Sequence, residues 1–256
     1  MTGRDPHPLE GAAEIAVLST LYGLTLWIVG PYVATNAWAV AFYWAAVAFA
    51  ASLILWVSPF VLHRDPPSLR GWGRRRERDD PGRAANAWPS YLALTVVAAV
   101  ALVAAAAIRD PALAAHVAWP RFWAKLVIYL VYGTIQAMVF FGWLQTRLRT
   151  TLAALVGREP LTRPLVAVAV ASLFALAHAP NWPLAALSLG VGFAWSWLFY
   201  ARPNVLLMGI SHGVLGAILS VVVGFYTRIG PFYAHPAGWI ARYAIPGLRD
   251  LTGDLF

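Results

Sequence analysis

Long apolar runs dominate this sequence and constrain its fold more than any other feature. A helix needs about 20 residues to cross a hydrocarbon layer roughly 30 Å thick. Seven runs approach or exceed this length, and their expected bounds are 12–33, 37–62, 89–108, 122–145, 164–179, 183–201 and 203–225. They lack the period-two alternation of a transmembrane β-barrel. We therefore expect an all-α fold, a polytopic transmembrane bundle of about seven helices.

The composition agrees with a membrane location. Of the 256 residues, 60% are hydrophobic and 12% are charged, and the mean hydropathy is +0.64. A soluble domain of this size has no need of so apolar a balance. The chain contains no cysteine, so disulfides and thiolate metal sites are excluded. We expect an integral, multi-pass membrane protein embedded in a lipid bilayer.

The arginines gather in two loops and predict the orientation of the bundle. The loop 63–88 carries seven of them, and the stretch after the fourth run carries Arg147, Arg149, Arg158 and Arg163. Cytoplasmic loops of membrane proteins are enriched in such residues. Seven spans with a cytoplasmic N-terminus place both stretches in the cytoplasm. Because the net charge of +8 lies in loops beside the membrane, we expect no nucleic-acid partner.

Three polar side chains interrupt the apolar runs: Gln136, His178 and His212. Polar groups are costly in lipid, so they face a protein interior or a wet cavity and are candidate functional residues. Counted from the cytoplasmic helix ends, Gln136 and His212 lie at a similar depth of about 13 Å, and His178 about 8 Å further. We expect three helices to bring them to one cavity. The alternative is that each forms only an interhelical hydrogen bond.

The segments around these residues, FFGWLQTRLR, ASLFALAHAP and NVLLMGISHG, resemble successive motifs of the CPBP family. Its members are the CAAX-protease and bacteriocin-processing (Abi) intramembrane endopeptidases. Phe174 and His178 fit the family's Phe-x-x-x-His motif, and His212 fits the histidine of its last motif. The resemblance implies N-terminal helices in 1–121, a CAAX-protease-like core in 122–225 and a tail in 226–256.

The sequence departs from the family at positions that carry its chemistry. With Gly142 aligned, the departing residues are Gln136 and Ala137 for two glutamates, Phe141 for an arginine and Gly216 for an asparagine. In the family, the first glutamate and the second-motif histidine activate a water, while the last histidine and the asparagine stabilise the oxyanion. An amide cannot take that proton near neutral pH. The resemblance thus implies a degenerate catalytic set at Gln136, His178 and His212.

Two functions remain open from the sequence. The first is a pseudoenzyme that binds a membrane-embedded or lipidated peptide, or a partner membrane protein. The second is a divergent but active intramembrane endopeptidase of the CAAX-processing type, with His178 as base, His212 as electrophile and Asn181 or Gln136 orienting water. A third, less favoured function is a small-molecule carrier in which Gln136, His178 and His212, which we call the polar trio, line the path.

Neither a buried acid nor a cofactor is expected at these positions. Glu14 is the one acidic residue within an expected span, and it lies near the cytoplasmic end. A catalytic zinc ion takes three protein ligands, whereas His178 and His212 supply two and Gln136 is a weak substitute. We therefore expect no cofactor, and a zinc ion at His178 and His212 is the weaker alternative.

Overall fold

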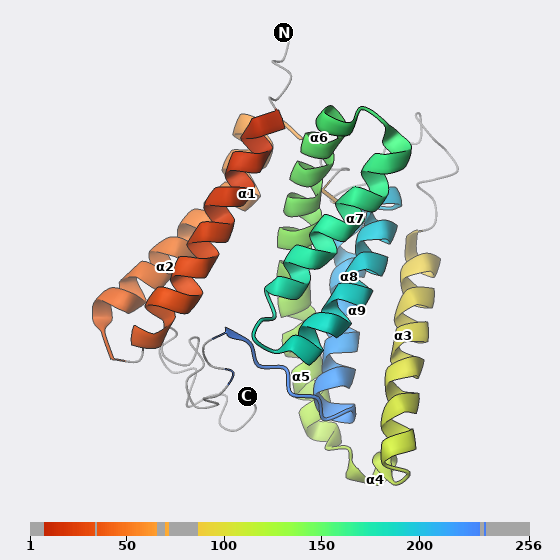
Figure 1. Ribbon diagram of the computed structural model, residues 1–256. Helices are drawn as coiled ribbons and strands as arrows, with labels where there is room; N and C mark the ends of the chain where they lie inside the picture. Colours follow the sequence, from red (N-terminus) through yellow and green to blue (C-terminus); the bar gives the residue numbers. More distant parts are fainter. Residues whose placement is uncertain (1–7, 34, 66–69, 72–86, 231–232, 234–256) are drawn as a thin grey trace.

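The structure is a computed structural model that describes residues 8–33, 35–65, 70–71, 87–230 and 233 (Figure 1). Every regular element in this part of the chain is helical, so the expected all-α fold is confirmed. The α-helices are α1 (Pro8–Gly23), α2 (Ala37–Ser52), α3 (Ala87–Arg109), α4 (Leu113–His116), α5 (Trp119–Gln136), α6 (Gln145–Val156), α7 (Glu159–Leu176), α8 (Trp182–Ala201) and α9 (Val205–Ala217). The π-helical stretches are η1 (Leu24–Val29), η3 (Leu53–Leu62), η4 (Ala137–Leu144) and η5 (Ile218–Val222), and η2 (Gly30–Tyr32) is a 3₁₀ turn.

The helices form the expected transmembrane spans. Within the described ranges, six segments are long and apolar enough to cross a bilayer, and a shorter apolar helix accompanies them. They are Leu9–Tyr32, Ala37–Leu62, Ala87–Arg109, Trp119–Val156, Trp182–Ala201 and Val205–Val222, with Pro160–Leu176 as the shorter one. Each coincides with one of the seven apolar runs. The bundle of about seven helices is therefore confirmed.

The fourth span is longer than its apolar run. It continues through α6 to Val156, so it contains 38 residues and measures about 57 Å, nearly twice the hydrocarbon thickness. Hydropathy locates only the apolar part, whereas the helix itself ends where Gly157 adopts a φ of 63°. Glycine takes this left-handed conformation readily, which makes it a common helix terminator.

The beginning of the loop 63–88 meets α6 at one end of the molecule. Asp65, which follows η3, forms an ion pair with Arg147 at the start of α6. This end also holds the turn between α6 and α7, at the top of Figure 1, and we call it the basic end. Most of the loop 63–88 and of the tail 226–256 lies outside the described residues.

A core of four spans positions the candidate site. In it α5 packs against α9, and α7 packs against α8. Small residues let α5 and α9 approach closely: a Cβ on Gly209 would lie 2.7 Å from the Cα of Thr134, and one on Gly213 would lie 2.8 Å from the Cα of Leu130. This Gly-x-x-x-Gly spacing is typical of tightly packed membrane helices.

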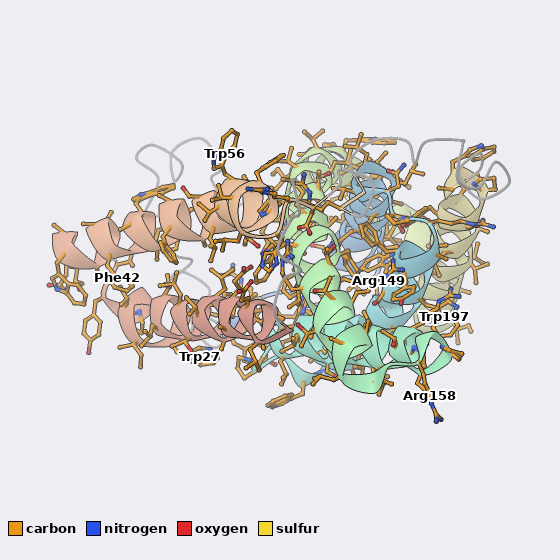
Figure 2. All side chains as sticks on the ribbon, turned by 90° about the horizontal axis from the view of Figure 1, so that it is seen from above. Trp27, Phe42, Trp56, Arg149, Arg158 and Trp197 are labelled. Atoms are coloured by element: carbon orange, nitrogen blue, oxygen red, sulfur yellow. The ribbon has the colours of Figure 1, made fainter. Side chains whose placement is uncertain are left out.

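The first two spans form a hairpin beside this core. Figure 1 shows α1 and α2 together on one side, with α3 on the opposite side. Figure 2 shows Trp27, Phe42 and Trp56 on the outer surface of the hairpin, where all three side chains are exposed. In a bilayer this apolar surface contacts lipid and carries no hydrophobic penalty. The hairpin reaches the core through α1 and α6.

Candidate functional site

His178 lies in the turn that follows α7, and its ring is fixed by a backbone contact. The Nδ1 atom is 2.7 Å from the carbonyl oxygen of Phe174. Since a carbonyl only accepts, Nδ1 carries the proton and Nε2 keeps its lone pair. The imidazole also packs edge-on against the Phe174 ring, with the ring centroids 4.8 Å apart.

His212 lies in the middle of α9 and faces the same phenylalanine. Its ring centroid is 5.7 Å from that of Phe174 and 5.1 Å from that of Trp195. Its Nδ1 atom is buried and has no hydrogen-bond partner among the described side chains and backbone. Both histidine rings therefore pack against Phe174.

Gln136 is the last residue of α5 and lies on the side of that helix that meets α9. The Cβ atom of His212 is 3.2 Å from the position of a Cβ on Gly133, and positions three residues apart share a helix face. The Oε1 atom of Gln136 is buried and also has no hydrogen-bond partner in the described part of the chain. Gln136 and His212 thus each keep an unpaired polar atom in the bundle interior.

The polar trio does not line the cavity found elsewhere in the bundle. That cavity, of about 310 Å³, lies between η3 and η4 and is lined by other residues.

The Asn181 side chain, which orients water in the active-enzyme alternative, forms hydrogen bonds with other groups. It donates to the carbonyls of Tyr226 at 2.7 Å and Arg228 at 3.1 Å, and its Oδ1 caps α8 by accepting from the backbone of Leu184. Asn181 holds the helix start in place.

Apolar packing surrounds the residues at which the sequence departs from the family motifs. Ala137 and Phe141 are completely buried, and the Phe141 ring lies 6.0 Å from Phe174 and 6.2 Å from Trp195. Gly216 faces the Tyr129 ring, and a Cβ there would lie 2.8 Å from the Cδ1 atom. The departures from the motifs are therefore part of the packing of the core.

The donor set does not suit a catalytic metal. Within the residues that the structure describes, three or more His, Cys, Asp or Glu side chains nowhere gather closely enough to hold an ion. The candidate site offers two imidazoles and an amide, whereas a catalytic zinc takes a third strong ligand. No step involving a metal is assigned to this site.

The structure contains a second cluster of polar side chains, which the sequence patterns did not predict. The carboxylate of Glu14 accepts a hydrogen bond from Ser58 Oγ at 2.5 Å and lies 2.5 Å from His63 Nε2. Arg147 Nε lies 3.6 Å from the same carboxylate, and Trp143 Nε1 donates to Ser58 Oγ at 3.0 Å. We call Glu14, Ser58, His63, Trp143, Arg147 and the paired Asp65 the Glu14 cluster.

The Glu14 cluster joins the hairpin to the core at the basic end. Its members come from α1, η3, η4 and α6 and from the residue positions after η3. The signal in the sequence was Glu14 itself, a carboxylate inside an apolar run. Its partners are 44 and 49 positions away, so no local pattern points to them.

Comparisons with known proteins agree with the resemblance to CAAX proteases. Residues 117–218 match the family model for the type II CAAX prenyl endopeptidase Rce1-like proteins. Neither the comparison with curated proteins nor the one with solved structures gave a match. The matched segment runs from the start of α5 through α9 and includes both histidines and Gln136. The α5–α9 core of this chain is therefore similar to the Rce1-like, CAAX-protease family of membrane proteins.

Proposed function

We propose that this chain is a catalytically degenerate member of the CAAX-protease family. In this proposal it binds a membrane-embedded or lipidated peptide, or a partner membrane protein, and does not cut it. The N-terminus is cytoplasmic, because the arginine-rich basic end then faces the cytoplasm.

The observation that carries the proposal is the absence of a carboxylate beside the two histidines in the described residues. Gln136 and the fully buried Ala137 occupy the positions of the family's glutamates. Glu14, the buried carboxylate of the hairpin, is already engaged by Ser58 and His63. Without a carboxylate the water that attacks a peptide bond has no base of the family's kind.

The unpaired interior atoms favour binding over a purely structural role. Leaving a buried hydrogen-bonding group without a partner costs about 1–3 kcal/mol. Gln136 Oε1 and His212 Nδ1 are both in this state. A bound peptide has backbone N–H and C=O groups that pair with an amide oxygen and an imidazole. Binding of such a peptide would therefore satisfy both atoms.

One observation favours the runner-up, a divergent active endopeptidase. The proton on His178 Nδ1 is held by the Phe174 carbonyl, so the Nε2 lone pair is available as a general base. In this alternative His212 polarises the substrate carbonyl.

Peptide binding and proteolysis by the purified protein separate the two functions. Wild type, His178→Ala and Gln136→Ala are each incubated with transmembrane peptides and farnesylated CAAX peptides. We expect binding without cleavage, and binding about fivefold to tenfold weaker in Gln136→Ala, as loss of one buried hydrogen bond implies. Cleavage by wild type that disappears in His178→Ala would overturn the proposal in favour of the active enzyme.

A restored variant tests whether the chemistry was lost at Gln136. Gln136→Glu returns one carboxylate beside the histidines and leaves the core residue Ala137 unchanged. Thermal unfolding of each variant shows whether the bundle is intact. Cleavage by Gln136→Glu but not by wild type would support the proposal of a degenerate member, since it locates the missing base. Absence of peptide binding by well-folded wild type would contradict it.

A further inference from the structure

A cavity of about 310 Å³ lies between η3 and η4, apart from the histidines. Its volume is at the lower end of the range of small-molecule sites. The residues around it are Ile54, Leu55, Phe60, Arg70, Met138, Gly142 and Trp143. All of them are apolar or aromatic except Arg70, so the cavity combines an apolar wall with one cation.

The Arg70 guanidinium is buried and has no carboxylate of its own. The residue is only 8% exposed, and its Nε atom has no hydrogen-bond partner among the described residues. The guanidinium stacks over the Phe60 ring at 4.4 Å. The neighbouring Asp65 is held by Arg147. Arg70 therefore has hydrogen-bond donors that the described side chains do not use.

Burial has an electrostatic consequence at this position. It lowers the pKa of the Arg70 guanidinium from its ordinary value, while the Asp65 charge acts in the opposite direction. An arginine nevertheless stays protonated at neutral pH. A poorly solvated cation beside an apolar wall is stabilised when an anion enters.

The backbone fixes Arg70 over the cavity. Gly71 has a φ of 75°, and its carbonyl accepts a hydrogen bond from Val205 N at 3.3 Å. A Cβ on Gly71 would lie 2.8 Å from the same nitrogen. The Arg70 carbonyl oxygen lies 3.2 Å from the position of a Cβ on Gly142. Two glycines thus let this segment pack directly on α9 and η4.

The surroundings indicate how a ligand reaches the cavity. Leu55 and Phe60 line it and are also about half exposed, and the adjacent Trp56 is mostly exposed. In a membrane these apolar side chains contact lipid tails. Arg70 follows the same helix at the basic end, at the depth where headgroups lie. A lipid at this depth can therefore place its apolar chain against the cavity wall and its anionic headgroup beside Arg70.

We propose that this cavity binds an amphiphile with a single anionic headgroup, a carboxylate or a phosphate. The headgroup pairs with the Arg70 guanidinium by charge-assisted hydrogen bonds. The apolar chain packs against Ile54, Met138 and Trp143. This site uses none of the polar trio, so the inference stands independently of the proposed function.

Ligand binding to the full chain in a neutral maltoside detergent tests the inference. The probes share a twelve-carbon chain and differ in the headgroup: dodecyl phosphate, dodecanoate and dodecyltrimethylammonium. Native mass spectrometry measures their affinities. A brominated fatty acid, which quenches nearby tryptophans, reports occupancy through Trp143, and Trp143→Phe identifies that contribution. We expect both anionic probes to bind and the cationic probe to bind at least tenfold more weakly.

Arg70→Gln is the decisive variant, and Arg163→Gln is its matched control. Arg163 also stacks over an aromatic ring, that of Trp197, at 4.0 Å, and it lies at the basic end away from the cavity. We expect Arg70→Gln to weaken the anionic probes about tenfold or more, as loss of a charge-assisted hydrogen bond implies, and Arg163→Gln to leave them unchanged. Leu55→Trp, which fills the cavity and keeps the charge, should weaken them too.

The headgroup and the chain are separated by two further comparisons. A preference for dodecyl phosphate assigns a phospholipid-like ligand, and a preference for dodecanoate assigns a fatty-acid-like one. Inorganic phosphate should not compete, because it lacks the chain. Equal affinity for the anionic and cationic probes, or unchanged affinity in folded Arg70→Gln and Leu55→Trp, would overturn the proposal.

Discussion

Single residues in this core are held by tight packing at positions where the sequence departs from the family motifs. Gly216, which the resemblance aligns with an asparagine, faces the Tyr129 ring, and this ring occupies the space that a side chain would need. Phe141, which the resemblance aligns with an arginine, packs its ring against those of Phe174 and Phe199. Restoring these groups is therefore a structural change as well as a chemical one.

Gly216→Asn should destabilise the protein by about 1–3 kcal/mol, the usual cost of overpacking a core. The cause is the contact with Tyr129, so Tyr129→Ala should relieve part of the loss. Thermal unfolding in detergent of both single variants and the double variant measures this coupling. A Gly216→Asn protein as stable as wild type would show that the ring moves aside without cost.

Phe141→Arg should be more damaging, with a loss of about 3 kcal/mol or more, because it places an unpaired charge in the bundle interior. Phe141 is completely buried among aromatic rings. Phe141→Leu keeps the site apolar and is the control, for which a smaller loss is expected. The comparison uses the fraction of folded protein in detergent and its unfolding temperature. Similar losses in the two variants would mean that cavity formation, not charge, dominates.

At the scale of helices, close approach of α5 and α9 sets the position of His212. The contact depends on Gly209 and Gly213, whose missing side chains let Thr134 and Leu130 come near. In lipid, van der Waals packing of this kind replaces the hydrophobic effect as the force between helices.

Gly213→Ala should destabilise the bundle by about 1–3 kcal/mol, because the added Cβ would lie 2.8 Å from the Leu130 backbone. Gly190→Ala in α8 is the matched control, since nothing lies within 4 Å of a Cβ there. It should be neutral or slightly stabilising, as alanine favours a helix over glycine. Unfolding temperatures of the two variants in the same detergent measure the difference. Equal stability would contradict the tight α5–α9 contact.

The sequence predicted where the helices lie better than it predicted where they end and which helices they pack against. Hydropathy located all seven spans because lipid rewards apolar residues directly. It ended the fourth span near 145, since it does not detect a helix that continues beyond the bilayer to Gly157. Helix depth predicted that His178 and His212 lie near one another, and both rings contact Phe174. No motif indicated that the cavity between η3 and η4 would be lined by other residues.

At the scale of the whole molecule, polar contacts join the hairpin to the core. The hairpin surface is apolar and is solvated by lipid, so burial provides little force for docking. The Glu14 cluster instead connects α1 and η3 to Arg147 and Trp143. The sequence did not predict it because its members are brought together only by tertiary structure. Such a buried network specifies one arrangement of the two parts.

Glu14→Leu should therefore loosen the hairpin. It removes the carboxylate that Arg147 and His63 face, and breaking a buried ion pair from one side costs about 3–5 kcal/mol. Hydrogen exchange measured by mass spectrometry should increase in α1, α2 and η3, while α5, α7, α8 and α9 stay protected, because the core keeps its own contacts. Glu10→Leu, one turn earlier on α1, is the control and should change little. If exchange rises equally throughout the chain, or equally in both variants, the Glu14 cluster does not act as the specific link between hairpin and core.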